Sequence, residues 1–333
     1  MRIGYIGLGR MGKNMVLRFM EKGIEVVAWN RSPEPLEEVA NAGAIAAKDL
    51  EDLVSKLRNN ISLNKQDRHV AGAPRDDGII VWLMLTAGPA VDEILNILTD
   101  KLSPGDLIID GGNSFYKETL RRNDILTKKG IHFMDVGTSG GVESAREGAC
   151  LMIGGSKKDY DRALEIFKAA AAPNAYGLFG PVGSGHFAKM VHNGIEYGMM
   201  EAIAEGAAIL KYSDFKYDLK EVFRVYSNRS IIESRLVSWT LNELKNDPEL
   251  SNTSSVIGSG GTAGKVKGEG HWTVQLANEM GIDAPVIEAS LKVREKSEKD
   301  PEDSPAGFRN KVVAAMRWQF GRHPVKKIEV KKK

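Results

Sequence analysis

The sequence predicts an α/β domain over residues 1–182, followed by an all-α domain over residues 183–333. In the first half, short apolar runs alternate with amphipathic stretches, which is the pattern of a mainly parallel sheet covered by helices on both faces. A glycine-rich turn follows the first apolar run directly. Beyond residue 182 the apolar residues recur with helical spacing, so no further strands are expected there.

The expected elements follow from this periodicity. The apolar runs predict strands at Ile3–Ile6, Glu25–Trp29, Ile79–Leu85, Leu107–Ile109, Phe133–Val136, Leu151–Ile153 and Ala175–Leu178. The amphipathic stretches predict helices at Lys13–Lys22, Ala90–Leu98, His186–Lys211, Leu219–Tyr226, Ile231–Lys245, Thr273–Met280, Val286–Lys296 and Gly307–Gln319. One polar segment, Asn59–Gly78, interrupts the approach to a strong strand, and we expect it to be a surface insertion.

Composition excludes several classes of protein. A chain of 333 residues with 42% hydrophobic residues can form two domains without disulfide or metal support. The formal net charge of +2 gives no reason to expect nucleic acid or a membrane surface as a partner. The basic run Lys326–Lys333 is expected to be a solvated tail. Because Cys150 is the single cysteine and no signal-peptide pattern begins the chain, a cytoplasmic location is expected.

The glycine-rich turn after the first strand has the form of a Rossmann phosphate-binding loop. Its residues are Gly7, Leu8, Gly9, Arg10, Met11 and Gly12. Here Gly7 allows the tight turn, Gly9 allows a pyrophosphate to approach the backbone, and Gly12 allows close packing of helix on strand. The helix N-terminus would supply unpaired N–H groups to the phosphates. Dinucleotide binding is therefore expected, the alternative being a glycine-rich turn without a ligand.

The end of the second strand favours NADP over NAD. NAD-binding domains carry an acidic residue there to hold the ribose hydroxyls. This chain has Asn30, Arg31 and Ser32, and the nearby Glu34 lies between two prolines that are expected to direct it away. A guanidinium at this position can pair with a 2′-phosphate. An Arg31 that is only solvent-exposed is the alternative.

A functional helix face is expected at the start of the second domain. At 3.6 residues per turn, Lys189, His192, Asn193 and Glu196 lie on one side of a helix. Lysine–glutamate pairs are common on exposed helices, but the added imidazole and amide favour a cleft. We expect Gly194 to open the surface beside them.

Two glycine-rich polar loops are expected to meet this helix at the carboxyl edge of the sheet, where open α/β folds bind ligands. One is Asp110-Gly111-Gly112-Asn113-Ser114 and the other is Gly137-Thr138-Ser139-Gly140-Gly141. Their backbone N–H groups and small side chains suit a carboxylate or hydroxyls, although ordinary turns have the same composition.

Together these motifs resemble the β-hydroxyacid dehydrogenases, and within them the compact form of the decarboxylating 6-phosphogluconate dehydrogenases. The glycine motif is common to the superfamily. The more specific likeness lies in Asp110–Ser114 with Tyr116-Lys117 and Arg121-Arg122, and in Lys189–Tyr197. It spans nearly the whole chain outside Asn59–Gly78. The resemblance implies oxidation and decarboxylation of 6-phosphogluconate to ribulose 5-phosphate with NADP, in the pentose phosphate pathway.

The resemblance also implies a role for each site residue. Lys189 would be the general base at the carbon-3 hydroxyl, and Glu196 the acid that protonates carbon 1 of the enediol. No metal is implied, and no cluster with metal-ligand spacing is present in the sequence. The remaining residues would bind substrate (Asn113, Ser139, Gly140, Gly141, His192, Asn193) or, beyond those above, cofactor (Leu85, Thr86, and Asn113 again).

The substrate phosphate would be held by cations and a tyrosine. Within the chain these are Tyr197, Lys267 and Arg294, and a partner subunit's C-terminal tail would add Arg317 and His323. A homodimer or homotetramer is thus implied.

Two features depart from the compact form, which commonly uses NAD. One is the segment that follows the second strand, and the other is Glu269, whose carboxylate would repel a phosphate unless it turns away or pairs with Lys265 or Lys267. Two other functions stay open: dehydrogenation of a small 3-hydroxy acid such as hydroxyisobutyrate, and nucleotide binding by an inactive regulator.

Overall fold

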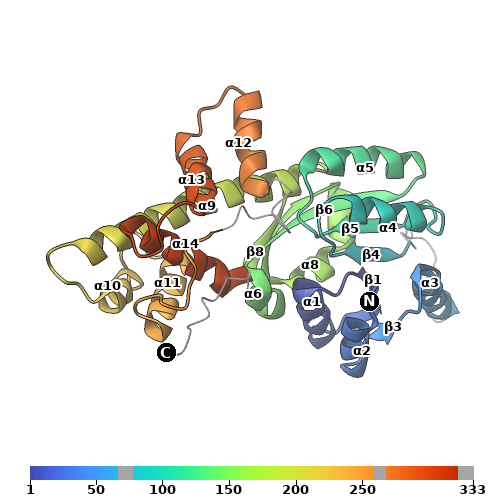
Figure 1. Ribbon diagram of the computed structural model, residues 1–333. Coiled ribbons are helices and arrows are strands. Elements are labelled where there is room, and N and C mark those ends of the chain that lie inside the picture. The colour runs from blue at the N-terminus through green and yellow to red at the C-terminus, as the bar shows by residue number, and fades with distance from the viewer. Residues whose placement is uncertain (67–77, 258–267, 322–333) are drawn as a thin grey trace. The chain divides into compact units, whose positions relative to one another are not determined.

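The computed structural model describes residues 1–66, 78–257 and 268–321 (Figure 1). The chain forms two compact units, Met1–Lys189 and Met190–Lys333. They meet within one continuous helix, α9 (Ser184–Tyr212). The domain boundary expected at residue 182 falls just before this helix, so α9 begins in the first unit and ends in the second.

The first unit is built on a single sheet of eight strands in the order β3-β2-β1-β4-β5-β6-β7-β8. All neighbouring strands are parallel except β6 and β7, which are antiparallel. The strands are β1 (Arg2–Ile6), β2 (Glu25–Trp29), β3 (Ile45–Ala46), β4 (Ile80–Leu83), β5 (Leu107–Asp110), β6 (His132–Ser139), β7 (Ala149–Gly154) and β8 (Ala171–Gly180). The predicted α/β class is confirmed. The short β3 was not predicted, because two residues show no periodicity.

Helices flank the sheet and close a hydrophobic core on each face. Along β4, Trp82 faces one core, which includes Phe19 and Phe167, while Val81 faces the other, which includes Leu53. Burial on both faces explains why these strands read as continuous apolar runs. The helices are α1 (Arg10–Glu21), α2 (Pro33–Asn41), α3 (Leu50–Gln66), α4 (Pro89–Thr99), α5 (Tyr116–Lys128), α6 (Gly141–Glu147), α7 (Lys157–Arg162) and α8 (Leu164–Ala170).

The segment expected to be a surface insertion begins inside a helix. Helix α3 continues to Gln66, so residues 59–66 are helical and not part of a loop. The polar side chains of this stretch concealed the helix from a search for apolar periodicity. Residues 67–77 lie outside the described part of the chain.

The second unit is all-α, as predicted. Besides α9 it contains α10 (Leu219–Tyr226), α11 (Arg235–Asn246), α12 (Glu269–Glu279), α13 (Pro285–Lys296) and α14 (Pro305–Gly321). Its core joins α9, α10, α11 and α14 through buried residues such as Met200, Phe223, Val237 and Val312. Helix α11 starts later than predicted, because the Ser234 side chain caps it by accepting a bond from Val237 N. Within the described ranges, no helix is both long and apolar enough to cross a membrane.

The start of α9 is fixed to the sheet by Asp135, a buried residue of β6. One carboxylate oxygen accepts a bond from Gly183 N at 2.6 Å and the other from His186 N at 2.7 Å. These are backbone donors that the first turn of a helix leaves without an intrahelical partner. The helix approaches so closely that a side chain at Gly185 would collide with backbone atoms of Met152, Asp135 and Gly154.

We expect Gly185→Ala to lower the free energy of unfolding by about 1–3 kcal/mol, because the added methyl group meets backbone that cannot move aside. The matched control is Gly206→Ala on the same helix, where a methyl group would meet no atom within 4 Å. That control should be neutral or stabilising by up to about 1 kcal/mol, from helix propensity. Urea unfolding of both variants tests the expectation, and equal effects would contradict it.

Candidate active site

The glycine loop has the backbone geometry that a bound dinucleotide requires. Gly7 has φ of +100°, and a side chain there would collide with the Met84 carbonyl. A side chain at Gly12 would collide with the Gly7 carbonyl, so helix α1 packs tightly against the turn. Above Gly9, by contrast, a methyl group would meet no atom within 4 Å. The space over the α1 N-terminus is therefore open to a phosphate.

Of the residues after β2, Asn30 bonds to the glycine loop, while Arg31 and Ser32 are exposed. The Asn30 side chain accepts a bond from Leu8 N at 2.9 Å and donates to Ser32 O at 2.9 Å. It therefore holds the glycine loop in place. Arg31 and Ser32 are exposed at the carboxyl end of the strand. Their position leaves Arg31 able to reach a ligand bound along the loop.

The loop after β5 is closed by its own acid. The buried Asp110 carboxylate accepts bonds from Gly112 N at 3.0 Å and from Ser114 Oγ at 2.7 Å. A side chain at Gly112 would collide with the Leu85 carbonyl, so the loops after β4 and β5 are in contact. Of the two candidate cofactor residues after β4, Leu85 is half-buried and Thr86 is exposed.

Asn113 joins this loop to the end of β6. Its amide donates to Thr138 O at 3.0 Å, and its amide oxygen accepts from Thr138 N at 2.8 Å. The residue adopts a left-handed backbone with φ of +56°, which asparagine tolerates. Each end of the amide retains capacity for one more bond to a ligand. The loop continues through Ser139 to Gly140 and Gly141, whose φ angles are +118° and +75°.

Lys189 lies against this second loop within the first unit. Its side chain is 5% exposed. A side chain at Gly137 would collide with the Lys189 Cβ, so glycine is required where the helix crosses β6. One turn earlier, His186 Nδ1 lies 2.8 Å from Thr119 Oγ1, which ties the helix to α5. The structure thus brings Lys189 and the Gly137–Gly141 loop together.

The next turns of α9, in the second unit, carry the other candidates. His192 Nδ1 lies 2.9 Å from the Asn193 amide oxygen and 3.8 Å from Glu196 Oε2. The Asn193 amide donates to the Glu269 carboxylate at the start of α12. Because α9 is unbroken, Lys189 shares the face of these residues. Glu269 is therefore held by an amide donor on the candidate face.

The expectation that Gly194 opens the surface is wrong. Gly194 is buried, and a side chain there would collide with Thr273 of α12. The Thr273 hydroxyl also donates to Met190 O at 2.7 Å. A glycine on a helix face can equally admit a second helix, and here α12 packs directly onto α9.

Two arginines lie beside Tyr197, of which Arg294 is buried and Arg317 is half-buried. The Arg294 guanidinium stacks on the Tyr197 ring, 3.4 Å from its centroid. Burial raises the pKa of Tyr197, while the same cause lowers the pKa of Arg317 to about 10. Arg317 interacts electrostatically with Arg294 and Tyr197 of its own chain and donates to Ile257 O. Contribution of Arg317 to a partner's site stays a prediction, and Lys267 and His323 lie outside the described residues.

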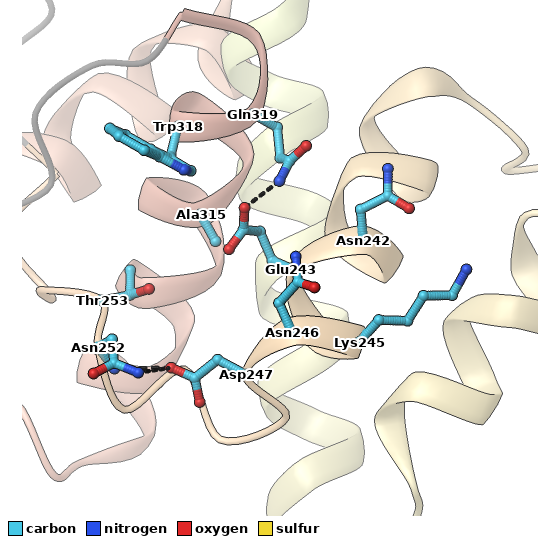
Figure 2. A pocket seen from close by; sticks show the side chains of 10 residues that line it. All are labelled: Asn242, Glu243, Lys245, Asn246, Asp247, Asn252, Thr253, Ala315, Trp318 and Gln319. Atoms are coloured by element: carbon cyan, nitrogen blue, oxygen red, sulfur yellow. Dashed lines mark hydrogen bonds between the residues drawn. The ribbon is translucent and has the colours of Figure 1, made fainter.

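A pocket of about 620 Å³ lies in the second unit away from these residues (Figure 2). It is lined by α11, α14 and residues 252–253, and none of the candidate site residues forms its wall. Figure 2 shows that four of its polar side chains pair with one another: Gln319 donates to Glu243, and Asn252 donates to Asp247. These internal bonds join the two helices and the loop, so we assign the pocket no catalytic part.

Sequence reasoning missed the residues that hold the site in place. Asp135 and Glu201 are each 4% exposed or less. The available signal for Asp135 was a carboxylate inside the apolar run Phe133–Val136, since a buried charge requires partners. In the part of the chain that the structure describes, no group of three or more His, Cys, Asp or Glu side chains could hold a metal.

Comparison with known proteins identifies the family. Residues 2–180 match the model of the NAD binding domain of 6-phosphogluconate dehydrogenase, and residues 185–333 match that of its C-terminal domain. The chain belongs to the 6-phosphogluconate dehydrogenase family. It is 36% identical to the NAD-dependent decarboxylating enzyme of Haloferax volcanii, over 98% of each chain. It is 35% identical to the NADP-dependent enzyme of Bacillus subtilis, over 88% of this chain and 60% of that one.

Solved structures agree with this membership of the 6-phosphogluconate dehydrogenase family. Plasmodium falciparum 6-phosphogluconate dehydrogenase is similar with a TM-score of 0.74 and 33% identity, over 95% of this chain and 70% of that one. Mycobacterium tuberculosis 3-hydroxyisobutyrate dehydrogenase shares the fold, with a TM-score of 0.69 but 18% identity over 95% and 99% of the two chains. The NAD(P)-binding domain is thus established, and the choice between NAD and NADP differs among relatives.

We expect Asp135→Asn to destabilise the protein by about 2–3 kcal/mol and to reduce turnover, because an amide cannot accept from both Gly183 N and His186 N. The start of α9, and Lys189 with it, would lose its fixed position. The matched control is Asp159→Asn, a buried carboxylate in the first turn of α7 that accepts from Ser156 Oγ and lies 2.5 Å from His132 Nδ1. The control should lose stability and keep its turnover at 25 °C. Urea unfolding and steady-state rates separate the two variants.

Proposed function

We propose that this chain catalyses the oxidative decarboxylation of 6-phosphogluconate to ribulose 5-phosphate and carbon dioxide, with reduction of NADP. The observation that carries the proposal is the arrangement on α9. Lys189 is buried against Gly137 of β6, and Glu196 lies two turns further along the same face. Family membership supplies the substrate, since relatives of similar length are named for it.

The residues present fit a bound dinucleotide, because the α1 N-terminus is open above Gly9 and Arg31 is exposed nearby. A bound nicotinamide would supply the acceptor for the hydride that leaves carbon 3 of the substrate. Lys189 takes the proton from the carbon-3 hydroxyl in that step. Lys189 then returns this proton to the ketone oxygen, which lets the carbon–carboxylate bond break with its electron pair moving toward that oxygen. Glu196 protonates carbon 1 of the enediol while Lys189 takes the proton back from the enediol hydroxyl, which leaves the ketone of ribulose 5-phosphate.

The cations Arg294 and Arg317 favour a phosphorylated substrate over a small 3-hydroxy acid. Arg294 is 3% exposed, and Arg317 interacts with it electrostatically. Two cations gathered near Tyr197 exceed what one carboxylate needs, and a phosphate dianion would offset both. A catalytically inactive regulator is the less favoured alternative, because it would not need both Lys189 and Glu196.

The finer assignments are proposals of the same kind. NADP is favoured because Arg31 stands where NAD-binding domains carry an acid. We propose a homodimer or homotetramer in which the C-terminal tail, with Arg317 and His323, completes the site of the partner. A cytoplasmic location in the pentose phosphate pathway follows from the single cysteine and the substrate.

One mixture tests the proposed function. The protein is incubated with NADP and 6-phosphogluconate, and both reduced cofactor and released carbon dioxide are followed. We expect the two products in equal amounts. Cofactor binding without turnover would support the regulator, and turnover only with hydroxyisobutyrate would support the small-acid dehydrogenase.

We expect Lys189→Met to lower kcat by a factor of about 10²–10⁴, because general-base catalysis at carbon 3 is lost. Binding of NADP should change little, since Lys189 is not part of the glycine loop.

Glu196→Gln should instead slow the step after carbon dioxide release, so that a pre-steady-state burst of reduced cofactor precedes slow turnover. Stopped-flow absorbance distinguishes the two variants, and a normal steady-state rate in Glu196→Gln would remove that residue from the mechanism.

We expect Arg31→Ala to raise the KM for NADP by about 10–100-fold, the loss of one charge-assisted bond to a 2′-phosphate. The KM for NAD should stay within about twofold, because NAD lacks that phosphate. The neighbouring Glu34→Ala serves as control, being exposed in the first turn of α2. Steady-state kinetics with both cofactors provide the comparison, and a wild-type preference for NAD would contradict the assignment.

A further inference from the structure

Glu201 is a buried acid beside Arg294, one turn beyond Tyr197 on α9. Its side chain is 4% exposed, and its Oε1 lies 3.5 Å from Arg294 Nε. Among the described residues, neither carboxylate oxygen has a hydrogen-bond partner of good geometry. A buried carboxylate without such bonds is costly, so a strong reason is needed for its presence.

The pKa of Glu201 depends on its burial and on the arginines nearby. Burial raises the pKa of Glu201 to about 7, against the opposing attraction of Arg294 and Arg309. Arg294 itself lies between the Tyr197 ring and Glu201, with one guanidinium nitrogen 3.5 Å from Met200 Sδ. Among the described residues, the acid that forms an ion pair with Arg294 is Glu201.

We propose that Glu201 is the internal counter-ion of Arg294 and that a bound phosphate group takes over this role. Binding of the phosphate is then coupled to uptake of one proton by Glu201. With Glu201 ionised, the acid offsets the charge of Arg294. With Glu201 protonated, the charge of Arg294 is no longer offset by this acid and attracts an anion more strongly. The assignment of the phosphate to Arg294 rests on the proposed function.

Charged groups from three helices face Glu201. Arg294 comes from α13 and Arg309 from α14, and Glu205 lies one turn along α9 itself. The exposed Glu205 adds a small repulsion. With a pKa of about 7, Glu201 changes its charge between pH 6 and 8.

The sign of the effect follows directly. A bound dianion repels the Glu201 carboxylate, which raises the pKa of Glu201 further, so protons are taken up on binding. Anion affinity must therefore fall as pH rises through 7, by at most about tenfold per pH unit for one proton. Phosphate esters themselves titrate near pH 6. Sulfate stays a dianion across this range and is the better probe.

The test is isothermal titration of the full-length protein with sulfate at pH 6.5, 7.5 and 8.5. We expect the sulfate Kd of the wild type to rise about tenfold or more over this range. Titrations in two buffers with different ionisation heats should show uptake of at most about three quarters of a proton at pH 7.5, because a group with a pKa of about 7 is already partly protonated there. Glu201→Gln keeps the shape and removes the titration, so its Kd should vary less than about twofold.

The matched control is Glu205→Gln on the same helix, which should retain the wild-type pH dependence. A pH-independent Kd in the wild type, or an unchanged slope in Glu201→Gln, would overturn the proposal. Should Glu201→Gln fail to fold, the measurement of proton uptake on the wild type still decides.

The proposal and the function can fail separately. Sulfate binding that Arg294→Met retains, with turnover of 6-phosphogluconate intact in the wild type, would place the phosphate elsewhere. A wild type that binds sulfate with proton uptake but does not oxidise 6-phosphogluconate would uphold the coupling and overturn the function. As an activity readout, Glu201→Gln should flatten the pH profile of KM while leaving kcat within about twofold.

Discussion

The site depends on the bond between one buried carboxylate and the first turn of one helix. Asp135 lies in β6, fully buried, and accepts from two backbone donors at the start of α9. A charge in that position is stabilised both by the unpaired N–H groups and by the positive end of the helix dipole. Because α9 carries Lys189, the base that we propose, this bond fixes the position of the proposed base against β6.

Glycines allow α9 to pack closely against the strands of the sheet. Gly185 on the helix and Gly137 and Gly154 on the strands each lie where a methyl group would strike a backbone or Cβ atom. The same strand, β6, ends in the loop that Asn113 clamps through Thr138. A single strand therefore positions the base, the loop beside it and the link to β5. Substitutions that move α9 by a fraction of an ångström should therefore reduce turnover without touching a ligand.

Periodicity and turn chemistry predicted most of this architecture, and the failures have identifiable causes. The glycine loop, the predicted strands and the face of α9 are local patterns, which a single sequence displays. Gly194 was misread because a gap in a helix face looks the same whether solvent or Thr273 fills it. Asp135 and Glu201 were missed because their importance comes from partners about 50 or 90 residues away. Such pairings are a property of the fold and have no signature in local spacing.

The two buried acids, Asp135 of β6 and Glu201 of α9, differ in how well their negative charges are compensated. Asp135 meets backbone donors with good geometry, so its negative charge is compensated and its role is to hold α9 in place. Glu201 meets a guanidinium at 3.5 Å and no good hydrogen-bond donor in the described structure, so its charge is poorly compensated and can change. Rigid anchoring suits the end of α9 that carries the proposed base, because proton transfer would need fixed distances. A titratable counter-ion suits the end where we propose that a highly charged group is bound and then released.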